Sequence, residues 1–136
     1  MKKQVLDASI IMTALINEEK KVSHFLEELL HSLQEKKIEI YSTPFMQYEV
    51  ANGLRFSFTD EQKSIEIFNK LSEIPIKIFF LNALQLKETI ILSYQLKTTV
   101  YDTAYHYIAQ LIDGLFITCD RAYYQKAKHL KHIMLI

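Results

Sequence analysis

Short apolar runs alternate with longer amphipathic stretches along this chain. The short runs are apolar on both faces, which is typical of strands buried in a parallel sheet. We expect strands at 4–8, 39–42, 76–80, 115–118 and 132–135. The longer stretches repeat apolar residues every three or four positions, which predicts helices. We expect these helices at 9–17, 22–35, 45–58, 61–72, 83–96, 100–112 and 121–129.

The expected helix ends carry residues that suit them. Asp60 and Asn82 are of the types that cap helix N-termini, and Thr98 or Thr99 is in place to cap the helix at 100–112. A glycine commonly takes the left-handed conformation just after a helix, and Gly114 stands there. In the helix after Asp60, three apolar residues are expected to face inward: Ile65, Phe68 and Leu71.

This alternation predicts an α/β fold, a three-layer sandwich in which helices flank a mostly parallel central sheet of about five strands. The chain has 136 residues and no internal repeat or linker, so we expect a single domain over 1–136. Parallel strands are joined by right-handed crossovers, and such folds carry their chemistry beyond the carboxyl ends of the strands.

Composition narrows the possible classes of protein. Sixteen basic residues balance sixteen acidic ones, so no net positive charge indicates a nucleic-acid binder. The single cysteine, Cys119, excludes an internal disulfide and a multi-cysteine zinc site. The two glycines, Gly53 and Gly114, are too few for a dinucleotide fingerprint or a P-loop. No apolar run approaches the roughly 20 residues that span a bilayer, and Asp7 interrupts any signal-peptide core, so we expect a soluble, cytoplasmic protein.

Four acids occupy unusual positions. Asp7 ends the first strand, Asp120 follows the fourth, and Glu49 lies early in the helix after the second strand. Asp102 lies in the first turn of a helix that is apolar on nearly all sides. Each acid has a structural alternative. Asp7 and Asp120 could be N-caps, Asp102 could complement a helix dipole, and Glu49 could be solvated.

The four acids together are harder to explain by structure alone, because all would project from one edge of a parallel sheet. Two carboxylates about 5 Å apart repel by roughly 3 kcal/mol at an effective dielectric constant of 20. The dipole of a helix stabilises a carboxylate at its N-terminus by only about 0.3–1 kcal/mol. A hard divalent cation offsets such repulsion, and oxygen ligands favour Mg²⁺ or Mn²⁺.

The segments around these acids follow one another in a defined order: Val5-Leu6-Asp7-Ala8-Ser9, Tyr48-Glu49-Val50-Ala51-Asn52-Gly53-Leu54, Tyr101-Asp102-Thr103-Ala104-Tyr105 and Ile117-Thr118-Cys119-Asp120-Arg121. In order, spacing and total length, the chain resembles a PIN domain, the nuclease fold of VapC-type toxins in toxin–antitoxin pairs. The resemblance covers nearly the whole chain.

The resemblance implies a ribonuclease, acting as an endonuclease, that uses Mg²⁺ or Mn²⁺. It assigns both metal binding and catalysis to the same four acids: Asp7, Glu49, Asp102 and Asp120. It assigns supporting roles to two hydroxyl residues and one amide: Ser9, Thr118 and Asn52. It also implies an RNA substrate, a cognate antitoxin as partner, and a homodimer that buries helix faces near the N-terminal half.

Two further residues leave alternatives open. His106, four positions after Asp102, stands where the family pattern has an aliphatic residue. It could join the metal site, hydrogen-bond the carboxylate of Asp102, or face solvent. Cys119 could be a nucleophile, although a cysteine in a short apolar run is more often a small buried hydrophobe.

Basic and aromatic side chains suggest binding surfaces. The run after Asp120 is locally basic, and three of its members are candidates for RNA binding: Arg121, Lys126 and Lys128. A solvated basic helix is the alternative. Five apolar residues could form a groove for the antitoxin or simply belong to the core: Phe45, Phe56, Phe58, Phe68 and Leu71. His24 and His31 lie outside the apolar stripe of their helix and are expected to be solvated.

The hypothesis from sequence is metal-assisted hydrolysis of phosphodiester bonds. A phosphoacceptor receiver domain would need an adjacent acidic pair near its start, which the chain lacks. A phosphatase of the haloacid-dehalogenase type would have Asp-x-Asp, and here Ser9 takes the second position. A non-catalytic PIN-like module that binds RNA or protein remains as the alternative.

Overall fold

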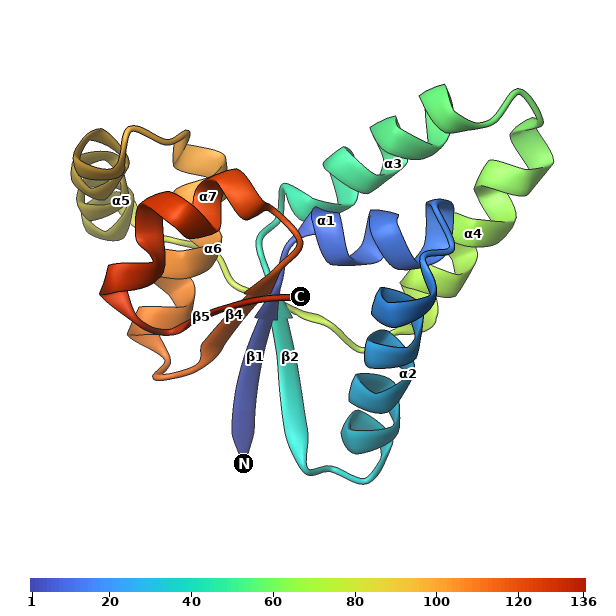
Figure 1. Ribbon diagram of the computed structural model, residues 1–136, viewed down its shortest axis with the longest axis horizontal. Coiled ribbons are helices and arrows are strands. Elements are labelled where there is room, and N and C mark those ends of the chain that lie inside the picture. The colour runs from blue at the N-terminus through green and yellow to red at the C-terminus, as the bar shows by residue number, and fades with distance from the viewer.

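The structure is a computed structural model that describes residues 1–136. Its centre is a five-stranded parallel sheet with strand order β3-β2-β1-β4-β5 (Figure 1). The strands are β1 (Lys2–Leu6), β2 (Ile38–Ser42), β3 (Lys77–Ile78), β4 (Leu115–Thr118) and β5 (Ile133–Leu135). The predicted three-layer α/β sandwich with about five parallel strands is confirmed.

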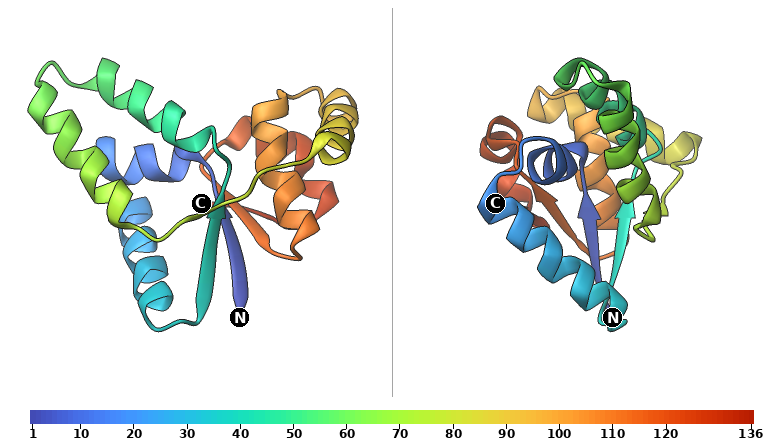
Figure 2. Two further views of the ribbon diagram at one scale, coloured as in Figure 1. Left: turned by 180° about the vertical axis from the view of Figure 1, so that it is seen from behind. Right: turned by 90° about the vertical axis from the view of Figure 1, so that its right-hand side faces the viewer.

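Seven α-helices flank the sheet in two groups. They are α1 (Ala8–Ile11), α2 (Lys20–Gln34), α3 (Met46–Ser57), α4 (Glu61–Glu73), α5 (Ala83–Leu96), α6 (Val100–Leu111) and α7 (Arg121–Ala127). A π-helical segment, Met12–Ile16, extends α1, and a 3₁₀ turn, Lys128–Leu130, follows α7. Figures 1 and 2 show α1 to α4 on one side of the sheet and α5 to α7 on the other. Right-handed crossovers place the two groups of helices on opposite faces, because β2 and β3 are added on one side of β1 whereas β4 and β5 are added on the other.

The central strands form the base of the core. Leu6, Ile40 and Ile117 are almost fully buried, as expected for strands covered by helices on both faces. The edge strand β3 has only two residues, whereas the sequence predicts five at 76–80. Beyond it, Phe80 points to solvent, since β3 pairs on one side alone and the chain leaves the sheet there.

Helix ends mostly follow the sequence signals. Asn82 forms a capping box with Gln85 at the start of α5, and Asp60 caps α4. Thr99, rather than Thr98, caps α6 by accepting a hydrogen bond from Asp102 N–H.

The prediction for the end of α6 is wrong in one respect. Asp113, not Gly114, takes the left-handed conformation, with φ of 52°. Gly114 comes one residue later and donates its N–H to the carbonyl of Ala109 at 2.8 Å, the long bond of a Schellman motif. A glycine is needed there for a different reason, because a Cβ would lie 2.7 Å from the carbonyl oxygen of Lys3 in β1.

The prediction that Ile65 faces inward is wrong. Ile65 in α4 is exposed, while Phe68 is half-buried and Leu71 is buried. Helix α6 is buried continuously from Thr103 to Ala109, but Tyr101 in its first turn is exposed. No helix of the protein has the length and apolar character needed to cross a membrane.

Candidate active site

The carboxyl ends of the two central strands place Asp7 beside Thr118. Leu6 pairs with Ile117 in the parallel register between β1 and β4, so the next residue of each strand emerges at the same edge. Thr118 Oγ1 donates to Asp7 Oδ2 at 2.5 Å, and Ser9 Oγ donates to Asp7 Oδ1 at 2.5 Å. Asp7 Oδ1 also accepts from Ile10 N–H at 3.3 Å, so the side chain caps α1. The carboxylate is thus held by three donors from two elements.

The environment of Asp7 favours its protonated form. Only 8% of the residue is exposed, and this burial raises its pKa to about 6 despite the three hydrogen bonds. The negative charge of Glu49 raises it further. An aspartate that only capped a helix would be expected at a lower pKa, because N-terminal donors stabilise its charged form.

The two hydroxyls that hold Asp7 also hold the next segment of the chain. Ser9 Oγ accepts from Cys119 N–H and Thr118 Oγ1 accepts from Asp120 N–H, each at 2.9 Å. Asp120 in turn caps α7 by accepting from Tyr123 N–H at 2.9 Å. The hydrogen-bond network therefore joins the first and last of the four acids through Thr118.

Glu49 is presented by the first turn of α3 and is half-buried. Tyr105 Oη, from the buried face of α6, donates to Glu49 Oε1 at 3.1 Å. Burial raises the pKa of Glu49 and the charge of Asp102 raises it further, while the bond from Tyr105 opposes both. Glu49 is thus neither fully solvated nor neutralised by a cation.

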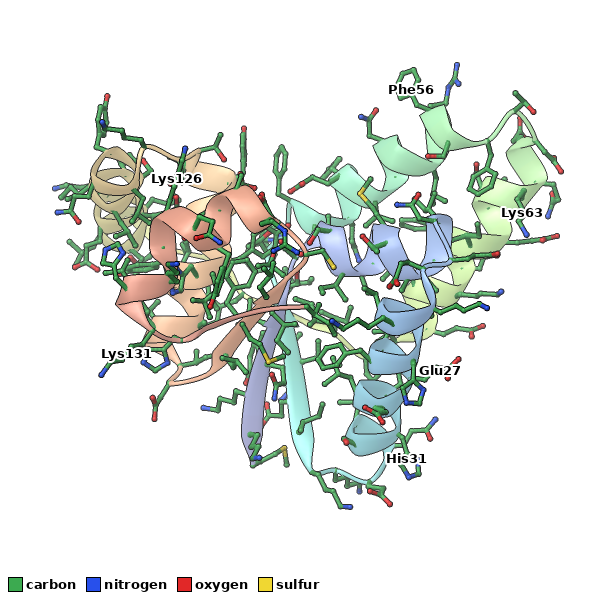
Figure 3. All side chains as sticks on the ribbon, in the orientation of Figure 1. Glu27, His31, Phe56, Lys63, Lys126 and Lys131 are labelled. Atoms are coloured by element: carbon green, nitrogen blue, oxygen red, sulfur yellow. The ribbon has the colours of Figure 1, made fainter.

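Asp102 and Asp120 line one small cleft of ≈ 230 Å³ at the N-terminal ends of α6 and α7. Burial raises the pKa of Asp102, and the negative charge of Asp120 adds to the effect. The other wall of the cleft includes Lys97 and Lys126, and Lys126 Nζ donates to the Lys97 carbonyl at 2.9 Å. In Figure 3, Lys126 extends from α7 on the side nearest α5.

The four acids form a series in which the negative charge of one raises the pKa of the next, over three steps. Glu49 acts on Asp7, Asp102 acts on Glu49, and Asp120 acts on Asp102. None of the ion pairs in the protein includes any of the four. The concentration of negative charge at this edge of the sheet is therefore not offset by a paired lysine or arginine.

The donor set matches a hard divalent cation in its chemistry, because all four side chains offer carboxylate oxygens that lack cationic partners. Their positions do not amount to a closed ligand shell. No group of three or more His, Cys, Asp and Glu side chains lies close enough together to hold one ion. A common ion would require at least some of these carboxylates to turn toward one another.

Three other candidate residues, Asn52, Arg121 and Lys128, make no hydrogen bond to any of the four acids, and Cys119 contacts the site through its backbone. Asn52 is exposed on α3. Arg121 and Lys128 are exposed on α7 and the turn after it, and neither lines the cleft of Asp102. Cys119 is half-buried, and burial raises the pKa of its thiol, which does not favour a nucleophilic thiolate.

His106 is neither a solvated residue nor a partner of Asp102. It is fully buried, and its ring nitrogens contact Tyr123 Oη and the carbonyl of Lys131. The two histidines of α2 are exposed as expected, with His24 near Glu28 and His31 near Glu35. Figure 3 shows His31 pointing away from the body of the protein, far along α2 from the carboxyl ends of the strands.

Sequence reasoning missed two residues that shape the site. Tyr105 follows Asp102 by three positions and so lies on a neighbouring face of α6. That spacing could have marked it as a partner for an acid. Lys97 carries no such signal, because its place in the cleft depends on the left-handed turn between α5 and α6.

Strand order, helix layers and acids at the carboxyl edge together define the class of fold as PIN-like. Sequence comparison matches the chain to no family model and to no curated protein. Comparison with solved structures does find matches.

The chain is similar to VapBC2 from Rickettsia felis, which was crystallised bound to a DNA fragment from the VapBC2 promoter. The TM-score is 0.69 at 14% identity, over 98% of this chain and 97% of that one. Its similarity to VapBC-1 from nontypeable Haemophilus influenzae has a TM-score of 0.66 at 17% identity, over 98% and 97%. For FitAcB from Neisseria gonorrhoeae the TM-score is 0.65 at 15% identity, over 92% and 93%. The PIN-like fold implied by the sequence resemblance is confirmed.

Proposed function

We propose that this protein is a metal-dependent ribonuclease and the toxin of a toxin–antitoxin pair. It would hydrolyse RNA phosphodiester bonds with Mg²⁺ or Mn²⁺ held by four acids: Asp7, Glu49, Asp102 and Asp120. One observation carries the proposal. The four carboxylates share one edge of the sheet and have no paired cation, and the pKa values of three of them, Asp7, Glu49 and Asp102, are raised by burial and by a neighbouring acid. Likeness of fold to VapBC and FitAcB structures supports it.

The side chains around the four acids would have distinct roles in this site. Ser9 and Thr118 hold the carboxylate of Asp7 in one orientation, and Tyr105 does the same for Glu49. When bound, Mg²⁺ or Mn²⁺ supplies a polarised water and neutralises charge on the phosphate. Lys97 and Lys126 would contact RNA phosphates across the cleft from the acids. Of the three basic residues that the sequence suggests for RNA binding, only Lys126 lines the cleft, and Lys97 is an additional candidate.

The test is a cleavage assay on a panel of RNA hairpins in Mg²⁺, Mn²⁺ and EDTA. We expect cleavage that requires metal and falls about 100-fold or more in Asp102→Asn. Asp60→Asn is the matched control, because Asp60 is also an acid near a helix start but caps α4 away from the site. Cleavage in EDTA, or no cleavage of any hairpin by antitoxin-free protein, would contradict the proposal.

For the antitoxin we propose a groove of ≈ 540 Å³ between α3 and α4. Its apolar lining includes Leu54, Phe58, Ile65 and Phe68. Of the five residues suggested by sequence, Phe58 and Phe68 line this groove, while Leu71 is buried in the core. Phe56 is exposed at the end of α3, where Figure 3 shows it pointing outward. An amphipathic segment of a partner would fit such a groove.

We propose further that the protein forms a homodimer, through α5 in the second half of the chain rather than through the helix faces near the N-terminal half that the resemblance implies. This helix buries the small polar residues Thr89 and Ser93 and exposes larger apolar ones. With Phe80, these exposed residues make up what we name the α5 face: Phe80, Leu84, Leu86, Ile90, Ile91 and Tyr94. A helix whose apolar side faces outward indicates a protein–protein contact. Figures 1 and 2 place α5 at the outer margin of its layer.

The alternative from another class is a non-catalytic PIN-like module that binds RNA or protein. The α3–α4 groove and the α5 face are compatible with it. A module of this kind would not need the four acids at one edge of the sheet, because crowded carboxylates without cations disfavour RNA binding. RNA binding without cleavage, unchanged by Asp102→Asn, would favour this alternative.

A further inference from the structure

His106 lies at the contact between the two helices that carry Asp102 and Asp120. It is fully buried on α6, one turn after Asp102. Its Nδ1 is 3.0 Å from Tyr123 Oη on α7, and its Nε2 is 2.6 Å from the carbonyl oxygen of Lys131. A buried histidine with both nitrogens engaged has one defined arrangement of protons.

The partners determine that arrangement. The carbonyl of Lys131 can only accept, so the proton of a neutral His106 is on Nε2, and Nδ1 is left as an acceptor. Tyr123 Oη must then donate to Nδ1. Burial lowers the pKa of His106, so the ring is held in the neutral form that this arrangement needs.

Tyr123 connects His106 to the candidate site. Its backbone N–H donates to Asp120 Oδ1, and the residue itself lines the cleft that contains Asp102 and Asp120. The path therefore runs from α6, through a side-chain hydrogen bond, to the first turn of α7 and its capping acid. Asp102 is on the same face of α6, one turn nearer the cleft, because it precedes His106 by four residues.

We propose that His106 is a positioning residue that sets the separation of the Asp102 and Asp120 carboxylates through its hydrogen bond from Tyr123. It does not touch metal or substrate. The proposal rests on the proposed metal-dependent function of these acids. It explains why a polar residue occupies a fully buried position on α6, where packing alone would be met by an aliphatic side chain.

Three variants separate the two hydrogen bonds of the ring. In His106→Asn the side-chain oxygen can replace Nδ1 as an acceptor for Tyr123. In His106→Gln the longer amide can replace Nε2 as a donor to Lys131, without an acceptor at the position of Nδ1. Tyr123→Phe removes only the donating hydroxyl. Tyr107→Phe is the control, since it removes the hydroxyl of a buried tyrosine on α6 that bonds Glu88 and does not line the cleft.

The first measurement is Mn²⁺ binding by calorimetry without RNA, followed by cleavage as a function of Mn²⁺ concentration. We expect Tyr123→Phe and His106→Gln to weaken Mn²⁺ binding about tenfold, a size typical of residues behind metal ligands. Cleavage at saturating Mn²⁺ should fall much less than binding does. His106→Asn should restore binding toward the wild-type value, and Tyr107→Phe should leave it unchanged.

A second measurement needs no metal. Nitrogen-15 NMR of metal-free protein should show His106 neutral, with the proton on Nε2. A proton on Nδ1 would overturn the proposal, as would Mn²⁺ binding by Tyr123→Phe equal to that of Tyr107→Phe. If wild-type protein neither binds Mn²⁺ nor cleaves RNA, the proposed function fails and this inference fails with it. If wild type does both and Tyr123→Phe is unaffected, only the inference fails.

Discussion

Asp7 has two opposing effects on the stability of the protein. As the cap of α1 it contributes hydrogen bonds, and as a buried carboxylate near Glu49 it carries a charge that its surroundings disfavour. The folded protein thus prefers Asp7 protonated up to about pH 6, whereas in the unfolded chain it ionises near pH 4. Because the folded state binds the extra proton between these values, the contribution of Asp7 to stability is largest below about pH 4 and falls as pH rises to about 6.

We therefore predict that Asp7→Asn stabilises metal-free protein at pH 7 by about 1–3 kcal/mol, since the amide keeps the cap without the charge. The variant should also remove most of the loss of stability between pH 4 and 6. Asp7→Ala is the control, and it should be less stable than Asp7→Asn because it loses the cap. Chemical denaturation across pH measures both. A less stable Asp7→Asn would mean that Asp7 is only a helix cap.

The sequence was sufficient to place the four acids at one edge of the sheet but not to orient them. Strand ends predict where Asp7 and Asp120 emerge, since parallel strands meet at a common edge. The direction of Glu49 depends on Tyr105 from a helix more than fifty residues later, and no local signal encodes that contact. His106 was misjudged for a similar reason, because its partners Tyr123 and Lys131 come from α7 and the turn beyond it.

At the scale of elements, the helices and central strands could be predicted because their apolar periodicity is a local property. Strand β4 is found where it was expected, at 115–118. Strand β3 is shorter than predicted, because an apolar run at a sheet edge is limited by how many partners the neighbouring strand provides. Gly114 was correctly singled out but for the wrong reason, since the close approach of β1 cannot be read from sequence.

The packing of α6 against β1 gives a prediction about this glycine. Gly114→Ala should destabilise the protein by about 1–3 kcal/mol, because its Cβ would meet a backbone oxygen of the central strand that cannot move aside. Gly53→Ala is the matched control. The Cβ added there meets the flexible end of Met12, and alanine is the better helix former in α3. Thermal unfolding of the two variants compares them, and equal effects would contradict the explanation.

At the scale of the whole molecule, the homodimer can be tested through the α5 face. We predict that the double variant Leu84→Lys/Ile91→Lys is monomeric at micromolar concentration, because two buried charges would be introduced in each copy. Phe56→Lys, which changes an equally exposed apolar residue on α3, should leave the dimer intact. Light scattering gives the mass of each. A monomeric wild-type protein would remove the dimer proposal.

Proton and metal should compete for the same edge of the sheet. We predict that Mn²⁺ raises the melting temperature more at pH 7 than at pH 5, because Asp7, with a pKa of about 6, is largely protonated at the lower pH. At 100 times the dissociation constant, the added stability at pH 7 would be about 2.7 kcal/mol.

The control for this competition is Asp7→Asn/Asp102→Asn, which should abolish the Mn²⁺ effect at both pH values. Melting curves with and without Mn²⁺ provide the measurement. A shift that survives in the double variant would place the ion elsewhere on the protein.

The hydrogen bond between Asp7 and Thr118 joins residues that are 111 positions apart. During synthesis, the N-terminal strand can pair with β2 as soon as both have left the ribosome, but its other edge stays open until β4 arrives. Until then Asp7 lacks Thr118, and Asp120 has yet to be made. If these carboxylates cut RNA, the growing chain is harmless until β4 and the segment with Asp120 have been made, and the hazard to the cell begins only when they fold into place beside β1.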